Sequence, residues 1–201
     1  MLDSKLRPLI DPPLNAIGRV LACAGVTANA LTCTGLALGL AGAASIALGH
    51  IGWGLALIIA NRVADGLDGA VARVRGPSDL GGYFDIVADF AFYVSIPLGF
   101  GLLSTANTLP ALVLVASFVL TGVSFLAFAV IAAKRGATTE AHGTKSFFYS
   151  TGLAEGTETI IVFIAMCAAP AWFGGLAYAY ASLCVLTVIQ RSAMAVAAFR
   201  D

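Results

Sequence analysis

The stretch "DGLDGAVARVRGPSDLGGYFDIVAD", from Asp65 to Asp89, determines how the rest of the chain is interpreted. It holds five acidic residues and two arginines, with strongly apolar sequence on both sides. Asp65 and Asp68 are three positions apart, and Asp85 and Asp89 are four apart, so each pair shares one face of an α-helix. The residues between the pairs include Gly and Pro and predict a turn. The two helices are therefore expected to run antiparallel, with their acidic ends meeting.

The composition is that of a membrane protein. Of the 201 residues, 59% are hydrophobic and 11% are charged, and the mean hydropathy is +0.92. A soluble domain carries about 25% charged residues, and one of this length cannot bury so much apolar surface. The net charge of zero gives no electrostatic basis for a nucleic-acid partner.

The sequence predicts an all-α polytopic membrane protein. A helix needs about 20 apolar residues to span the hydrocarbon core. Six stretches meet this length, and short turns connect most of them. The six predicted transmembrane helices cover residues 28–49, 51–73, 82–103, 109–133, 147–173 and 176–199.

The segment before the first span predicts an amphipathic helix that lies in the membrane interface. Apolar residues recur in residues 1–24 at helical spacing, with basic residues between them. We expect Pro12 and Pro13 to interrupt this helix. The whole chain, residues 1–201, is expected to form a single domain, with residues 25–201 as its six-helix core.

The basic residues predict the orientation. With six spans, all eleven Lys and Arg residues fall on one side of the membrane. The positive-inside rule makes that side cytoplasmic. Both termini and the acidic stretch are therefore expected on the cytoplasmic side of a bacterial inner or cell membrane.

Four carboxylates crowded together repel one another unless cations neutralise them. Oxygen ligands without His or thiolate suit Mg²⁺, Mn²⁺ or Ca²⁺ rather than zinc. Two divalent ions held by carboxylates suit phosphoryl chemistry. The alternative is a set of salt bridges with Arg62, Arg73 and Arg75. Glycines beside the acids, such as Gly69, favour close approach of a ligand to the helix.

These residues carry a resemblance to a known family. Asp65-x-x-Asp68-Gly69-x-x-Ala72-Arg73, followed by Gly81-x-x-x-Asp85-x-x-x-Asp89, resembles the signature of the CDP-alcohol phosphotransferase family. The gap between Arg73 and Gly81 is one residue shorter than in the family pattern, so Gly82 is an alternative partner glycine. The upstream segment "GVTANALT" is similar to a "TPNxLT" segment of many members.

The resemblance implies a reaction and roles for residues. Members transfer a substituted phosphate from a CDP-linked donor to an alcohol and release CMP. By similarity, Asp65, Asp68 and Asp85 hold divalent metal, with Asp89 also near it. Asp89 is the implied catalytic base, and Gly69 and Arg73 contact the CDP moiety. The resemblance favours CDP-diacylglycerol as donor, with Mg²⁺ or Mn²⁺ as cofactor, and a homodimer.

The acceptor alcohol stays open. Lys134, Arg135, Lys145 and Arg191 form an anion pocket for a phosphorylated alcohol if they converge beside the metals. Alternatively they are anchors that extend to lipid headgroups.

Two further acids, Glu155 and Glu158, enter the fifth predicted span on one face. They either pair with Arg191 or Lys145, or contact a cationic or polyhydroxyl acceptor such as serine, choline or a sugar alcohol.

Two other functions compete with the transferase. Intramembrane carboxylates also mark cation transporters, but a transporter is expected to carry acids near the midplane, without arginines beside them. A non-catalytic lipid-binding protein has no need of Asp89.

Overall fold

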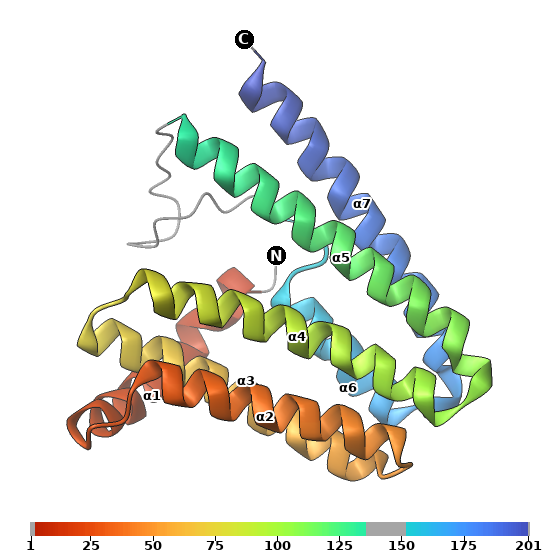
Figure 1. Cartoon of the computed structure of the whole chain (residues 1–201), viewed down its shortest axis with the longest axis horizontal. Coiled ribbons are helices and arrows are strands. Elements are labelled where there is room, and N and C mark those ends of the chain that lie inside the picture. Colours follow the sequence, from red (N-terminus) through yellow and green to blue (C-terminus); the bar gives the residue numbers. More distant parts are fainter. Residues whose placement is uncertain (1–2, 136–151, 201) are drawn as a thin grey trace.

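The computed structural model describes residues 3–135 and 152–200, and Lys145 lies outside these ranges. Within them the regular elements are all helices, in agreement with the predicted class (Figure 1). They are α1 (Asp3–Cys23), α2 (Ala28–Ala47), α3 (Ile51–Arg75), α4 (Asp79–Leu103), α5 (Thr105–Lys134), α6 (Gly156–Ala168), the short 3₁₀ helix η1 (Pro170–Trp172) and α7 (Phe173–Phe199).

The long helices pack side by side, with α2 between α3 and α4. α2 contacts both α3 and α4, α4 contacts α5, and α5 contacts α7 (Figure 1). The shorter α6 meets α3 and α7, while α1 packs against α3. Because α3 is followed after a short turn by α4, the acidic ends of the two helices are neighbours, as the sequence predicts.

The number of spans differs from the prediction. Among the described residues four helices are long and apolar enough to cross a membrane: α2, α4, α5, and η1 together with α7. α3 is apolar only in its first half, because Arg62, Asp65 and Asp68 enter its second half. The six predicted spans are therefore not confirmed, although the chain is an integral membrane protein by its apolar helices.

The fifth predicted span, residues 147–173, is shorter as a helix than expected. α6 has 13 residues and begins at Gly156. At about 1.5 Å per residue it is too short for the hydrocarbon core. It ends at Ala168 because Pro170 cannot donate a helical hydrogen bond and disfavours the helical conformation of the residue before it.

The prediction that Pro12 and Pro13 interrupt the N-terminal helix is wrong. α1 continues from Asp3 to Cys23 through both prolines and Pro8. Proline's fixed φ is compatible with a helix, and the cost is a lost hydrogen bond to the carbonyl four residues earlier and a steric clash of the ring with that carbonyl. Pro12 and Pro13 are exposed, so water can satisfy those carbonyls.

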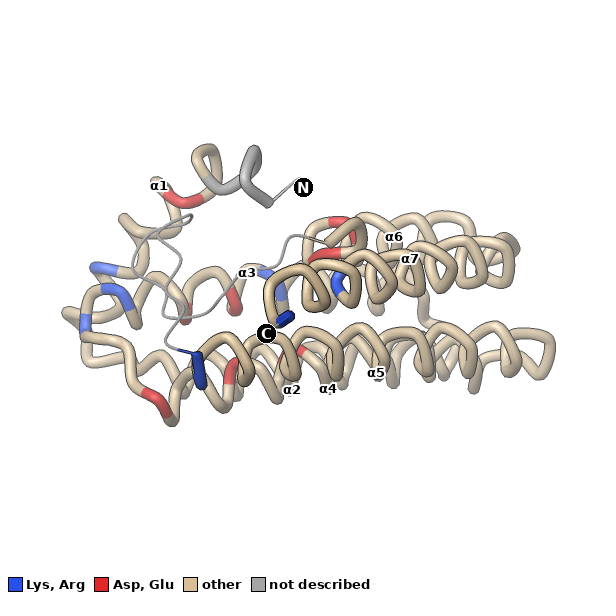
Figure 2. The backbone as a smooth tube through the Cα atoms, turned by 90° about the horizontal axis from the view of Figure 1, so that it is seen from above, with Lys and Arg blue, Asp and Glu red and all other residues tan. Residues whose placement is uncertain are grey.

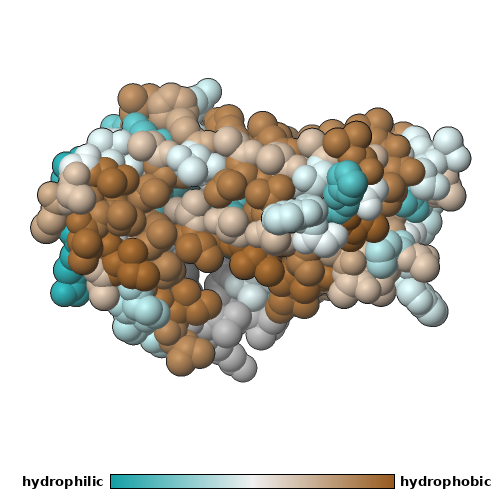
Figure 3. All heavy atoms as spheres, turned by 90° about the horizontal axis from the view of Figure 1, so that it is seen from below, coloured by the Kyte–Doolittle hydropathy of each residue, from teal (hydrophilic) through white to brown (hydrophobic). Residues whose placement is uncertain are grey.

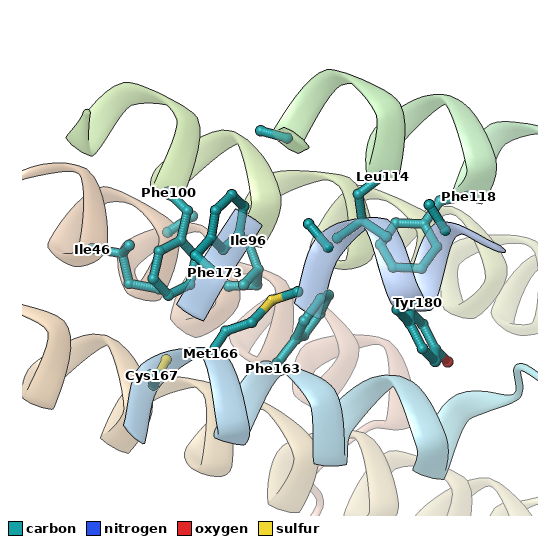
Figure 4. Packing of buried hydrophobic residues seen from close by; sticks show 14 of the residues in the cluster. Ile46, Ile96, Phe100, Leu114, Phe118, Phe163, Met166, Cys167, Phe173 and Tyr180 are labelled. Carbon is teal, nitrogen blue, oxygen red and sulfur yellow. The ribbon is translucent and has the colours of Figure 1, made fainter. Parts of the chain in front are cut away.

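The apolar core lies between α2, α4, α5, α6 and α7. Figure 4 shows Phe100 stacked on Phe173, with ring centroids 4.6 Å apart, and Met166 and Phe163 of α6 pointing into the same cluster. Phe100, Phe163, Phe173 and Met166 are completely buried. Although α6 is short, packing in the core fixes its position.

Glycines let α2 approach its neighbours closely. A Cβ at Gly99 of α4 would lie 2.5 Å from the backbone oxygen of Ala43. A Cβ at Gly39 of α2 would lie 2.6 Å from the Phe92 ring. The glycines at this contact are therefore used for packing within the chain.

The outer surface is apolar. Large hydrophobic side chains such as Leu102, Val130 and Leu109 are more than 60% exposed. Figure 3 shows apolar residues over much of one face, with hydrophilic residues towards its left edge. This surface suits contact with lipid.

Charge is confined to one part of the molecule. In Figure 2 the described Lys, Arg, Asp and Glu residues lie in the left half and centre, and the right end carries none. The α2–α3, α4–α5 and α6–α7 connections contain no charged residue.

Candidate active site

Three aspartates from two helices form the centre of the site. Asp65 and Asp68 come from α3 and Asp85 comes from the first turns of α4. One carboxylate oxygen from each lies within 4.8 Å of the others. Three negative charges at this distance destabilise the site unless a cation joins them.

Asp68 is held in place by a helix outside the pair. The Thr32 hydroxyl of α2 donates to Oδ2 of Asp68 over 2.7 Å. Both residues are buried, at 8% and 5% exposed. A charge-assisted hydrogen bond of this length fixes the orientation of the carboxylate.

Asp89 lies one turn further along α4 and has a different partner. Nη1 of Arg62 contacts its Oδ1 at 3.1 Å and the Asp65 carboxylate at 3.5 Å. The Arg62 guanidinium also lies 4.3 Å from the centre of the Phe92 ring. Asp89 is therefore not within the compact group of three carboxylates, but Arg62 connects it to that group.

Arg62 is positioned by its own neighbours. Its Nε donates to Oδ1 of Asn61 over 2.6 Å, and Nδ2 of Asn61 donates to the Gly35 carbonyl over 2.7 Å. Asn61 is 2% exposed. Hydrogen bonds from two helices thus hold the guanidinium between the acids.

Arg73 is exposed near the end of α3. Its Nε and Nη2 donate to Oδ1 of Asn15 on α1, over 3.1 and 2.8 Å. A Cβ at Gly69 would lie 3.4 Å from Nη1 of Arg73, so the absence of a side chain leaves this surface open. The structure thus brings the two residues expected at the CDP moiety together.

The structure distinguishes the two glycines at the start of α4. The Gly81 N–H donates to the Ser78 hydroxyl over 3.1 Å, and a Cβ at this position would lie 3.3 Å from Oδ1 of Asn29. A Cβ at Gly82 would meet nothing within 4 Å. Gly81 is therefore the more closely packed of the two glycines, against Ser78 and against Asn29 of the "GVTANALT" segment.

The donor set fits a divalent cation. Three carboxylates supply hard oxygen ligands, and no His or Cys belongs to the group. Oxygen ligands of this kind suit Mg²⁺ or Mn²⁺. The salt-bridge alternative holds only in part: Arg62 pairs with Asp65 and Asp89, and Arg73 bonds to Asn15 instead.

The described basic residues that were expected at the acceptor differ in their burial and in their hydrogen-bond partners. Lys134 is exposed at the end of α5. Arg135 donates to the Phe199 carbonyl over 2.9 Å. Arg191, 6% exposed, donates from Nη1 to the Thr121 carbonyl and the Ser124 hydroxyl. Only Arg191 among these three is buried between helices.

The sequence alone did not identify Thr32, Asn61 and Asn15 as parts of the site, whereas Arg62 was expected there only as a salt-bridge partner. Thr32 and Asn61 are polar residues inside apolar helices, which is a signal that could have found them. Their partners are distant in sequence, so spacing could not pair them.

The chain matches the CDP-alcohol phosphatidyltransferase family over residues 25–199. It is 44% identical over 192 residues to the inner membrane protein YnjF of Escherichia coli, covering 95% of this chain and 93% of that protein. It is 35% identical over 100 residues to the archaetidylinositol phosphate synthase of Pyrococcus horikoshii, about half of each chain (49% and 53%).

Solved structures share the fold. The phosphatidylinositol phosphate synthase PgsA1 of Mycobacterium tuberculosis with CDP-DAG bound superposes with a TM-score of 0.66 at 22% identity, covering 91% of this chain and 93% of that one. The same enzyme in complex with manganese and citrate gives a TM-score of 0.66 at 21% identity, over 89% and 86% of the chains.

The helical fold, the aspartate group and these matches define a membrane-embedded phosphotransferase. The chain belongs to the CDP-alcohol phosphatidyltransferase family. It is an enzyme of CDP-alcohol phosphatidyl transfer, and this membership favours the transferase over the transporter and lipid-binding alternatives.

Proposed function

We propose that the protein transfers the phosphatidyl group of CDP-diacylglycerol to the hydroxyl of a small polar alcohol and releases CMP. The observation that carries this proposal is the meeting of Asp65, Asp68 and Asp85 within 4.8 Å at the polar ends of two antiparallel helices. The PgsA1 structure with CDP-DAG bound supports this donor, because it shares the fold.

Asp65, Asp68 and Asp85 would hold divalent metal, Mg²⁺ or Mn²⁺, and we expect two ions. When bound, the ions supply positive charge to the diphosphate and to the leaving CMP. Manganese in the related PgsA1 structure supports this choice of cation.

The chain's own residues divide the remaining work. Asp89 accepts the proton of the acceptor hydroxyl while the alcohol oxygen bonds to the phosphatidyl phosphorus and the bond to CMP breaks. Arg62 orients the Asp89 carboxylate through the 3.1 Å contact. Gly69 and Arg73 form the surface for the CDP moiety, with Asn15 holding the guanidinium.

We place the acidic ends of α3 and α4 at the cytoplasmic surface of the membrane, with both chain termini on the same side. The confinement of charged residues to one part of the molecule supports this orientation (Figure 2). α1 would lie in the interface there, against α3. At this depth a lipid donor and a water-soluble acceptor can meet.

The test is CMP release by purified protein in mixed micelles with CDP-diacylglycerol, Mn²⁺ or Mg²⁺, and a panel of alcohols. We expect release with at least one acceptor, lost on chelation and restored by adding the ion back. Asp89→Asn is expected to abolish turnover while donor binding survives, with Asp79→Asn as the matched control. If no alcohol supports release, or if Asp89→Asn turns over normally, the proposed function is wrong.

A further inference from the structure

The guanidinium of Arg62 contacts two carboxylates that belong to different helices. Its Nη1 lies 3.1 Å from Oδ1 of Asp89 on α4 and 3.5 Å from Oδ2 of Asp65 on α3. Among the described residues, Asp65 belongs to the compact group of three carboxylates and Asp89 does not. A guanidinium is charged at every pH at which a protein is folded. Arg62 therefore brings a permanent positive charge into contact with one expected metal ligand and with the proposed base.

Contacts that involve no carboxylate also hold this guanidinium. Its Nε donates to Oδ1 of Asn61 over 2.6 Å, and its carbon lies 4.3 Å from the centre of the Phe92 ring. Phe92 is completely buried and Asn61 is 2% exposed. Neighbours packed this closely restrict the rotamers that a side chain can adopt. The position of the guanidinium therefore does not depend on the acids alone.

The α2 helix leaves room for both of these neighbours. A Cβ at Gly39 would lie 2.6 Å from the Phe92 ring and 3.1 Å from Nδ2 of Asn61. The same Nδ2 donates to the Gly35 carbonyl over 2.7 Å. Three helices thus determine where Arg62 lies: α2 through its glycines, α3 through Asn61 and α4 through Phe92.

Little space remains beside the Asp89 carboxylate for a further cation. A cavity of about 10 Å³ is lined by Arg62, Asp65, Asp68 and Asp89, among other residues. This volume holds about one water molecule. A divalent ion placed in it would lie next to the guanidinium, and the two positive charges would repel each other. A metal ion can therefore use Asp89 as a ligand only at the expense of its contact with Arg62.

We propose, on the basis of the proposed function, that Arg62 competes with the divalent metal for the Asp89 carboxylate. The affinity for metal then depends on Asp65, Asp68 and Asp85, and Asp89 contributes little to it. The Asp89 carboxylate stays available to accept the proton of the acceptor hydroxyl. Arg62 is thus a positioning residue, because it acts on the reaction through Asp89.

The test is a double-mutant cycle on Mn²⁺ affinity, measured by electron paramagnetic resonance of free Mn²⁺ with purified protein in detergent. Such a cycle isolates the interaction between two residues. We expect Asp89→Asn to change the affinity of the otherwise native protein by less than about threefold, and to lower that of the Arg62→Gln protein by about tenfold, the scale on which residues around a metal tune its binding. The difference arises because Asp89 can reach the metal only when the guanidinium is gone.

Two further variants complete the cycle. Arg75→Gln removes a positive charge from the exposed end of the same helix and is the matched control. In that background Asp89→Asn should act as it does in the native protein. Asn61→Ala keeps the charge of Arg62 but removes the acceptor of its Nε, so the effect of Asp89→Asn should lie between the native and Arg62→Gln values. This variant tests the competition even if Arg62→Gln does not fold.

The results that would overturn the inference are distinguishable from failure of the proposed function. A native protein without saturable Mn²⁺ binding would remove the metal centre, and with it both proposals. Equal effects of Asp89→Asn in the native, Asn61→Ala and Arg62→Gln proteins would remove the competition alone, since CMP release by the native protein would be unaffected. A tenfold loss of affinity on Asp89→Asn in the native protein would identify Asp89 as a metal ligand despite Arg62, and would also contradict the inference.

Discussion

Asp68 is the buried member of the three-carboxylate group, and a hydroxyl from another helix determines its orientation. The Thr32 hydroxyl has one hydrogen and two acceptors within reach, the Asp68 carboxylate at 2.7 Å and the Ala28 carbonyl at 3.1 Å. The shorter bond to the charged acceptor is the stronger one. Thr32 therefore acts as a positioning residue for a metal ligand.

Thr32→Val removes this hydroxyl and keeps the shape of the side chain. We expect Mn²⁺ affinity to fall about tenfold, because partners of metal ligands tune binding to this extent. Thr34→Val is the control, since the Thr34 hydroxyl donates only to the Ala30 carbonyl of its own helix. Mn²⁺ titration of the two purified variants measures the difference, and equal affinities would contradict the role of Thr32.

At the residue scale, spacing predicted part of the site and could not predict the rest. The pairs Asp65/Asp68 and Asp85/Asp89 were expected to converge, and three of the four do. The fourth, Asp89, lies one turn further along α4, where Arg62 contacts it. Helical periodicity shows which residues share a face. It does not show whether a carboxylate will join the other carboxylates or pair with an arginine.

Among the elements, α1 packs against α3 beside the proposed donor site. Its Leu14 lies over Gly66 of α3, where a Cβ would come within 2.7 Å of the leucine side chain. Gly18 of α1 packs equally closely on Ala70. These contacts bring Asn15 to Arg73.

Asn15→Ala is expected to raise KM for the CDP-linked donor about threefold to tenfold with little change in kcat, because Arg73 loses the acceptor that orients it. Asn15→Asp retains Oδ1 and should restore the donor KM. Steady-state CMP release over a range of donor concentrations measures both. A fall in kcat alone, or no rescue by aspartate, would argue against a positioning role.

The close contact between α2 and α4 predicts that a larger residue at this contact lowers the stability of the protein. Gly99→Ala places a methyl group against the Ala43 carbonyl, a backbone atom that cannot rotate away. Overpacking of this kind costs about 1–3 kcal/mol, so the midpoint of thermal unfolding in detergent should fall by several degrees. Gly175→Ala on α7, with nothing within 4 Å of the added carbon, should not lower it. Equal midpoints for the two variants would contradict the close packing of α2 and α4.

The helix boundaries agree with the prediction where strong turn residues separate the apolar stretches. They differ where proline lies within or beside such a stretch. α2, α3, α4 and α5 begin or end within a few residues of the predicted limits. The fifth span failed because hydrophobicity continues past Pro170, whereas the helix cannot. For α1 the prediction was too short, because the exposed prolines remove hydrogen bonds without interrupting the helix.

In the whole molecule, the separation of charged and uncharged ends defines an axis. Trp53 and Trp172, both 72% exposed, lie near the uncharged connections, where aromatic residues anchor a protein in the membrane interface. The distribution of charge was predictable, because it depends on the order of residues along the chain. The number of spans was less predictable from the sequence, because it depends on which helices pack inside the molecule.

The orientation can be tested in a background in which the native cysteines are replaced by serine. A cysteine at Trp172 should react with a membrane-impermeant maleimide added to spheroplasts. A cysteine at Arg75 should react only after the membrane is opened. The reverse pattern would contradict a cytoplasmic active site.

The central claim is that the aspartates of α3 and α4 form one divalent-metal centre. The most direct measurement is an electron paramagnetic resonance titration of free Mn²⁺ with purified protein in detergent. We predict saturable binding by the native chain and loss of that binding when Asp65, Asp68 and Asp85 are all replaced by asparagine, with Asp79→Asn unchanged. Equal Mn²⁺ binding by the native and triple-substituted proteins, both folded, would contradict the claim.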